Sequence, residues 1–418
     1  MDLKNVTWNL TDLLKKEELE KEKQEIRKRA QHLESYKEQY QATIATDLFG
    51  KILKEKEELL CKFARVGAYA NLTFAKKITD PKAQALVLQI DQLGAEISNQ
   101  ILFLSLRFKD FEEKNAQRLI KAFPQHQHYL ERIREFKEFT LSEEVEKVIT
   151  LKDITGGGAL NAVYDTLASE LTFKFQEKDL TQEELLKYVR DSNPEIRKQA
   201  YDTLLTTYQK QKNIISTIYQ NIVQDWKNEL QLRTYSSPIS VRNKANDLED
   251  QEVELLLKVF QKNLPLFRAY FTVKAKTLKM KKLRRYDIYA PFTKTKKQYT
   301  FPEAKKIVLE AFTPFPEFVK NATAIMENHI DSEIIKGKRS GAFCYGIIPT
   351  LKPYIMMSFT GEKRAIQTLA HELGHGIHDM LASSNSYFQY SPVLPLAETA
   401  STFAEIVSEY SFSADSPY

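Results

Sequence analysis

The chain has 418 residues, of which 42% are hydrophobic and 28% charged, so it holds enough apolar material for two or three packed cores and lacks the composition of a disordered protein. Its 61 basic and 56 acidic residues nearly cancel to a net charge of +5, a balance that does not require a nucleic-acid partner. The two cysteines, Cys61 and Cys344, form no CxxC motif, which argues against a disulfide framework and favours a reducing compartment.

The N-terminal segment mixes acidic, basic and short apolar pieces and lacks the basic-then-apolar layout of a signal peptide. The richest apolar stretch, near Ile97 to Leu106, is about ten residues long, well short of the roughly 18 needed to cross a bilayer. We therefore expect a soluble, cytoplasmic protein with no membrane partner. Glycine and proline are scarce while Glu, Lys, Leu and Gln recur, so the composition favours a mostly α fold.

The first third of the chain is predicted to be a stack of helices. From Asp47 to Phe74, apolar residues recur at steps of three and four, the spacing of an amphipathic helix. Asp80 and Pro81 then predict a new helix start, because aspartate can cap free backbone amides and proline suits the first turn. Apolar residues continue at helical spacing from there to Ile101.

A domain boundary is predicted near residue 180. Three glycines at 156–158 interrupt the helical pattern, and a polar, acidic stretch follows at 176–184. We therefore expect an N-terminal helical domain over residues 1–180 and a second domain over residues 181–418. In the second domain, Asn193 and Pro194 predict the start of a long helical run.

Dense basic runs at 276–285 and 294–297 allow two interpretations. A solvated surface is favoured, because no nucleic-acid-binding module or clear pattern of stacking aromatics accompanies them. A basic helical scaffold for nucleic acid is the less favoured alternative. Further on, apolar and β-prone residues at 342–348 and 354–357, separated by prolines, predict two short strands and a small sheet just before the next helix.

That helix carries the motif HELGH, which matches the HExxH pattern. Positions four apart lie on one face of a helix, so His371 and His375 can converge on one metal ion. Glu372 sits beside that face, from which its carboxylate can reach a metal-bound water as a general base. The apolar periodicity of the surrounding residues supports a helix at this position.

A catalytic zinc site needs a third protein ligand and an open fourth position. The segment LAETASTFAEIVSEY predicts a second helix, which follows a loop and can lie antiparallel to the first. Glu398 is the expected third ligand, and Glu405, seven residues further on nearly the same face, is the alternative. His378 lies about 10 Å along the helix from His371, too far to share one ion, so we assign it either a second-shell or substrate-side position or a structural one.

With these motifs the chain resembles the oligoendopeptidase F branch of the thimet oligopeptidase family of zinc metallopeptidases. The resemblance runs from about residue 140 to 410 through GGGALNAVYDTLASELTF, NPEIRKQAYDTL, RRYDIYAP and KRSGAFCYGIIPTLKPYIMMSFTGEKRAIQTLAHELGHGIH. It implies a two-lobed helical body with a deep channel and one small sheet flanking the site, to which Tyr354 would belong. It also implies one Zn²⁺ per chain, held by His371, His375 and Glu398, with Glu372 as the base.

The implied function is hydrolysis of peptide bonds in short unstructured oligopeptides by residues of the 181–418 catalytic domain. Few residues follow Glu398, whereas the family continues through a long helical segment, so the resemblance also predicts a chain that is shortened at its C-terminus. The alternative function is accordingly a peptide-binding homologue with weak or no turnover. Tyr354 and Glu405 join His378 as candidates for residues that contact the metal ligands or the substrate without binding the metal.

Overall fold

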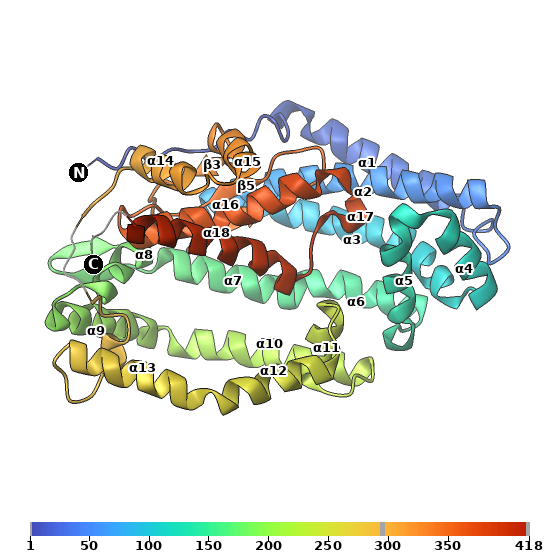
Figure 1. Cartoon of the computed structure of the whole chain (residues 1–418). Helices are drawn as coiled ribbons and strands as arrows, with labels where there is room; N and C mark the ends of the chain where they lie inside the picture. Colours follow the sequence, from blue (N-terminus) through green and yellow to red (C-terminus); the bar gives the residue numbers. More distant parts are fainter. Residues whose placement is uncertain (1, 293–296, 415–418) are drawn as a thin grey trace.

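A computed structural model describes residues 2–292 and 297–414, and the side chains of these residues up to Tyr410. The chain is mostly helical, as the composition predicts, and its strands are short (Figure 1). Within the described residues no helix is both long enough and apolar enough to cross a membrane.

The N-terminal region is built on three long helices, α1 (Leu19–Glu34), α2 (Thr46–Lys76) and α3 (Pro81–Asp110), which pack against one another in pairs. Asp80 accepts a hydrogen bond from the Lys82 amide, so the predicted cap is confirmed. The apolar stripes of the three helices meet in one large core, which includes Phe49, Leu93 and Phe103. The shorter helices α4 (Glu113–Ala122) and α5 (Gln127–Glu135) close one side of this core.

The middle of the chain begins with two consecutive helices, α6 (Glu143–Thr155) and α7 (Gly157–Glu170), which meet at the predicted glycines. A two-stranded antiparallel hairpin follows, β1 (Phe173–Phe175) and β2 (Lys178–Leu180), which the sequence did not predict. Its Phe173 and Phe175 share a small core with Leu185 and Ala200. This core spans residue 180, and the division into domains at that residue stays a prediction.

Six helices continue from the hairpin, and Asn193 caps the second of them as expected. They are α8 (Gln182–Leu186), α9 (Pro194–Lys210), α10 (Lys212–Leu232), α11 (Pro238–Ala245), α12 (Asp250–Lys262) and α13 (Leu264–Thr277). A short 3-10 turn, η5 (Arg285–Asp287), returns to α9, where the Asp287 carboxylate accepts a hydrogen bond from Arg197 at 2.7 Å. This contact fixes the end of the helical hairpin α12–α13 to the body of the protein.

The last region holds the sheet that the sequence predicted. Strand β5 (Tyr354–Met356) lies in the centre, parallel to β3 (Ile330–Asp331) and antiparallel to β4 (Phe343–Tyr345), so β4 is an edge strand. Helices α14 (Phe301–Ala311), α15 (Pro316–Met326), α16 (Lys363–Leu381), α17 (Tyr387–Tyr390) and α18 (Leu394–Ala414) complete the region.

The packing of its apolar side against the neighbouring core fixes the position of helix α16. Ile366, Leu369, Leu373 and Ile377 recur at helical spacing, are fully buried, and join a core made with α14, α15 and the sheet. The HELGH motif therefore sits on a helix that is held on one side by packing, and its histidines lie on the other side. A rigid support of this kind fixes the directions of the two imidazoles.

Candidate metal centre

The two predicted helices do lie against each other, in antiparallel directions. Ion pairs join Lys363 to Glu409 and Arg364 to Glu405, and near the other end of the contact His375 faces Glu398. A glycine permits this approach, since a Cβ atom on Gly374 would lie only 2.7 Å from the Ala400 carbonyl oxygen of α18. The loop between the helices thus returns the chain so that α18 lies alongside α16 (Figure 1).

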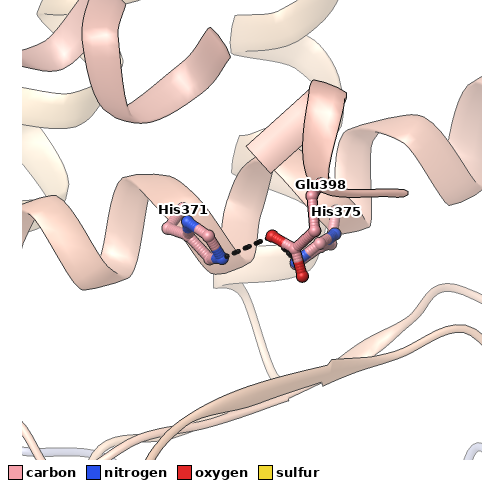
Figure 2. A group of neighbouring side chains, drawn as sticks. All are labelled: His371, His375 and Glu398. Atoms are coloured by element: carbon pink, nitrogen blue, oxygen red, sulfur yellow. Dashed lines mark ion pairs between the residues drawn. The ribbon is translucent and has the colours of Figure 1, made fainter. Parts of the chain in front are cut away.

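His371, His375 and Glu398 converge at this crossing (Figure 2). Nε2 of His371 is 3.5 Å from Oε2 of Glu398, and Nε2 of His375 is 3.9 Å from the same oxygen. One ligand atom from each residue lies within 4.8 Å of the other two. Ligands on a tetrahedral ion with bonds of about 2 Å are separated by about 3.3 Å, so small side-chain movements would close this group around a zinc ion.

The donor set fits a divalent metal ion better than it fits an ordinary ion pair. Two imidazoles and one carboxylate are the protein ligands of a His2Glu catalytic zinc site. Among the described residues, the side-chain partners of Glu398 are these two histidines and Ser401, whose hydroxyl donates to Oε2 at 2.9 Å. No lysine or arginine of the described chain lies at ion-pair distance from that carboxylate to neutralise it.

Glu405, the alternative ligand, instead supports the histidine. Its Oε2 is 3.4 Å from Nδ1 of His371, and Arg364 donates a hydrogen bond to its other oxygen. A carboxylate on Nδ1 leaves Nε2 free to face Glu398, the arrangement in which a histidine is oriented for a metal. A ring N–H of His375 likewise donates to the backbone carbonyl of Ala397.

Glu372 lies on the buried side of the site and is only 6% exposed. Burial raises the pKa of its carboxyl to about 8, and the negative charge of Glu398 adds to the rise, while a hydrogen bond from the Cys344 backbone amide opposes it. Cys344 belongs to the edge strand β4, so the sheet holds this carboxyl directly. A neighbouring cation would shift the balance back towards the carboxylate form.

The other candidates lie in different surroundings. Burial lowers the pKa of His375, as do the neighbouring His371 and, to a smaller extent, His378, which is half-buried on the next turn of α16. Tyr354 is buried, stacks on His329, and donates its hydroxyl to the carbonyl of Asn9 at 3.1 Å. The described contacts of Tyr354 therefore join the sheet to the N-terminal segment.

Several supporting groups escaped the sequence analysis. Arg364, Ser401, the Cys344 amide and the Ala397 carbonyl hold the candidate residues, yet no motif marks them, because their partners come from other elements. Asp379 is a further case, since burial raises the pKa of its carboxyl to about 7. It lies against the backbone of Gly346, where a Cβ atom would come within 2.3 Å of Oδ2. Asp379 follows Glu372 by seven residues and so lies on nearly the same face of the helix, which was the sequence signal that could have identified it.

Comparison with known sequences gives consistent results. Residues 186–415 match the profile described as Peptidase family M3, and residues 108–173 match the profile described as Oligopeptidase F. The chain is 26% identical over 419 residues to oligopeptidase PepF of Bacillus subtilis (strain 168), covering 97% of this chain and 62% of the relative. It is 28% identical over 383 residues to an oligoendopeptidase F homolog of Borreliella burgdorferi, and this match covers 87% of this chain and 63% of the relative. The chain thus spans less than two thirds of the length of these relatives.

Solved structures share the fold. PZ peptidase A with inhibitor 2 superposes with a TM-score of 0.79 at 17% identity, covering 93% of this chain and 68% of the other. Oligoendopeptidase-F from Enterococcus faecium superposes with a TM-score of 0.64 at 17% identity, covering 96% and 69%. The fold predicted from composition and helical periodicity is therefore confirmed.

Proposed function

Because this chain belongs to peptidase family M3, whose profile matches more than half of it, we propose that it is a zinc-dependent endopeptidase acting on short unstructured peptides. One observation carries the proposal above the others: helices α16 and α18 bring His371, His375 and Glu398 together, with Glu372 buried beside them. The relatives' names, oligopeptidase and oligoendopeptidase, support the substrate class.

His371, His375 and Glu398 would hold one Zn²⁺ per chain. Zinc bound there would supply a Lewis acid for the scissile carbonyl and would lower the pKa of the attacking water. Three protein ligands are the number expected for a catalytic zinc site, whereas a structural site has four. The donor chemistry supports zinc over magnesium or calcium, because imidazole nitrogen is a poor ligand for those harder ions.

Glu372 is assigned the proton transfers. Its carboxylate would accept a proton from the attacking water and deliver it to the leaving amine as the peptide bond breaks. Burial and the Cys344 amide restrict the carboxyl to one position next to the ligand cluster. Such restriction lowers the cost of organising the reacting groups during the reaction.

Glu405 and Arg364 are assigned a positioning function. Glu405 would keep His371 in the tautomer that carries its proton on Nδ1, and Arg364 holds Glu405 in place. Loss of such an outer partner commonly weakens metal binding by about 10- to 100-fold.

Strand β4 is the proposed support for the substrate backbone. It is the edge strand of its sheet, and the Cys344 amide points away from β5 towards Glu372. An extended peptide that paired with this edge would pass beside the base and the metal ligands, and it would have to share or replace the bond between the Cys344 amide and Glu372. Most extended segments of folded proteins are already paired within their own sheets, so this mode of binding favours short unstructured substrates. We extend the proposal to a cytoplasmic location, for which the two free cysteines are the support.

The test combines zinc analysis with cleavage of a quenched fluorescent peptide. The proposal expects one zinc per chain, cleavage that a chelator stops and added zinc restores, and a Glu372→Gln variant that keeps its zinc but loses cleavage. Glu310→Gln, an exposed carboxylate on α14, is the control and should cleave normally. Stoichiometric zinc and peptide binding without cleavage would instead favour the alternative of a peptide-binding homologue. Absence of zinc binding would contradict the proposed zinc-dependent endopeptidase.

A further inference from the structure

An open cavity of about 320 Å³ lies between the N-terminal helices and α10. Helices α3, α6 and α10, the turn at 136–140 and the residue at 235 supply its lining. None of the described residues that line it belongs to α16 or α18, so the cavity is separate from the candidate metal centre. Its volume is at the small end of the range for ligand pockets, which are about 300–1,000 Å³. We call it the α3–α10 pocket.

One part of the α3–α10 pocket is apolar and aromatic. Leu102 and Leu106 come from α3, and Phe136 and Phe139 come from the turn that follows α5. The ring of Phe139 stacks on Tyr235 with a centroid distance of 4.1 Å and an interplanar angle of 5°, so each ring fixes the orientation of the other. This wall suits an apolar side chain, and a planar one most of all.

Lys109 brings a positive charge into the pocket without a counter-ion. Its side chain is half-buried, and its Nζ atom donates a hydrogen bond to the Thr140 hydroxyl at 2.6 Å. No carboxylate of the residues that the structure describes lies at ion-pair distance from this ammonium. Burial lowers the pKa of Lys109, and Arg233 adds to the fall, while the charges of Glu146 and Asp110 oppose it. A cation that has lost water without gaining a counter-ion favours the binding of an anion.

The two carboxylates that line the pocket differ in their free oxygens. Glu146 accepts hydrogen bonds from both terminal nitrogens of Arg233 and from the Leu141 amide, so both of its oxygens are occupied. Glu229 accepts from Nε of Arg233 through Oε1, and within the described chain its Oε2 has no hydrogen-bond partner. Lys109 and Arg233 together balance Glu146 and Glu229, so the four charged side chains of the pocket carry no net charge.

We propose that the α3–α10 pocket binds a free apolar α-amino acid in its zwitterionic form. The carboxylate of the amino acid would pair with Lys109, its ammonium would donate to Oε2 of Glu229, and its side chain would lie against the aromatic wall. One open cation and one open acceptor favour a zwitterion, because a simple carboxylate or amine would leave one of the two unpaired. The proposal uses no residue of the metal centre and does not depend on the proposed function.

The experiment measures the binding of L-phenylalanine to the full chain by isothermal titration calorimetry. One site per chain is expected. Two analogues, 3-phenylpropionate without the ammonium and phenethylamine without the carboxylate, should each bind at least tenfold more weakly than L-phenylalanine. Because the three compounds are compared on the unaltered chain, this part of the test does not depend on whether any variant folds.

Substitutions then locate the site. Lys109→Met should lower the affinity for L-phenylalanine at least tenfold, because it removes the partner of the carboxylate. Glu229→Gln should weaken L-phenylalanine binding but leave 3-phenylpropionate unchanged, since only the amino acid carries an ammonium. Lys121→Met replaces an exposed lysine of α4 and is the control, which should bind L-phenylalanine as the parent chain does. The unfolding temperature of each variant without ligand shows that it is folded.

Three outcomes would overturn the proposal: no binding of L-phenylalanine, an analogue that binds as tightly as L-phenylalanine, or equal affinities in Lys109→Met and Lys121→Met. The last outcome would place the ligand elsewhere in the chain. Zinc analysis tests the proposed function separately, so either proposal can fail without the other.

Discussion

Two clusters of charged side chains in this protein are built in opposite ways. At η5, the buried Asp287 carboxylate accepts hydrogen bonds from two guanidinium groups, those of Arg197 and Arg284. At the crossing of α16 and α18, the carboxyls of Glu372 and Glu398 lie near each other and two histidines, with no arginine or lysine of the described chain paired to Glu398. In the first cluster the carboxylate is paired with opposite charges, whereas in the second the two carboxyls repel each other and Glu398 is paired only with histidines among the charged groups of the described chain.

The pKa values record the same difference. Burial tends to raise the pKa of Asp287, but the hydrogen bonds from Arg284 and Arg197 outweigh burial and hold that pKa below its usual value. At Glu372 burial and a neighbouring negative charge act together, and the pKa rises to about 8. A charge arrangement that costs stability is characteristic of a functional site, because a ligand of opposite charge can relieve it.

The largest expected effect is on stability at η5. Arg197→Met leaves Asp287 buried with one fewer partner, and breaking a buried ion pair costs about 3–5 kcal/mol. Urea unfolding should show this loss, while zinc affinity stays unchanged because α16 and α18 are untouched. Lys198→Met is the matched control, since Lys198 forms an exposed pair with Asp202 and such pairs contribute little to stability. Equal losses of stability in the two variants would show that the buried pair at η5 contributes no more than an exposed one.

Glu398→Gln should have the opposite pattern of effects, in which stability is kept and zinc affinity is lost. Removing this charge relieves its repulsion of Glu372, so the metal-free variant should unfold at a temperature no lower than the parent chain. Zinc affinity should fall by more than the roughly 100-fold that loss of an outer partner causes, because a ligand is lost. Competition with a chelator measures the affinity, and a scan of metal-free protein measures the stability. A clear drop in the metal-free unfolding temperature would show that Glu398 is structural.

A smaller effect on zinc affinity is expected at Glu405, which contacts His371 from outside the group of proposed ligands. Glu405→Gln removes the negative charge that faces Nδ1 of His371, and zinc affinity should fall by about 10- to 100-fold. Glu409→Gln, one turn further along α18, changes a carboxylate that pairs with Lys363 and should leave zinc affinity within a factor of about two. If the two variants lost zinc equally, the effect would reflect α18 as a whole rather than the orientation of His371.

The smallest effect is on the pH dependence of stability. Because the pKa of Asp287 is lower in the folded chain than its usual 3.8, its contribution is complete above that value and is lost as the pH falls through the folded pKa. Asp287→Asn should therefore lose stability at neutral pH and show a shallower decline in unfolding temperature below about pH 4. An unchanged acid slope in the variant would mean that Asp287 does not contribute to acid sensitivity.

Local sequence signals accounted for much of the fold. Asp80 and Asn193 cap helices where the sequence predicts starts, because a cap needs only a residue and the amides just beyond it. The hairpin β1–β2 was missed, because its strands are three residues each and their pairing is stabilised by Leu185 and Ala200 further along the chain. Periodicity carries little information over so few residues.

For the site, the sequence by itself determined that His371 and His375 share one helical face and that Glu372 lies beside it, because the period of the α-helix fixes those directions. Only the tertiary structure brings the Glu398 carboxylate close to both histidines, since that placement depends on how α18 crosses α16 at Gly374. It likewise placed the Cys344 amide of β4 against Glu372. Spacing along one helix is a local property, whereas the partner that a side chain meets is set by packing between elements far apart in the sequence.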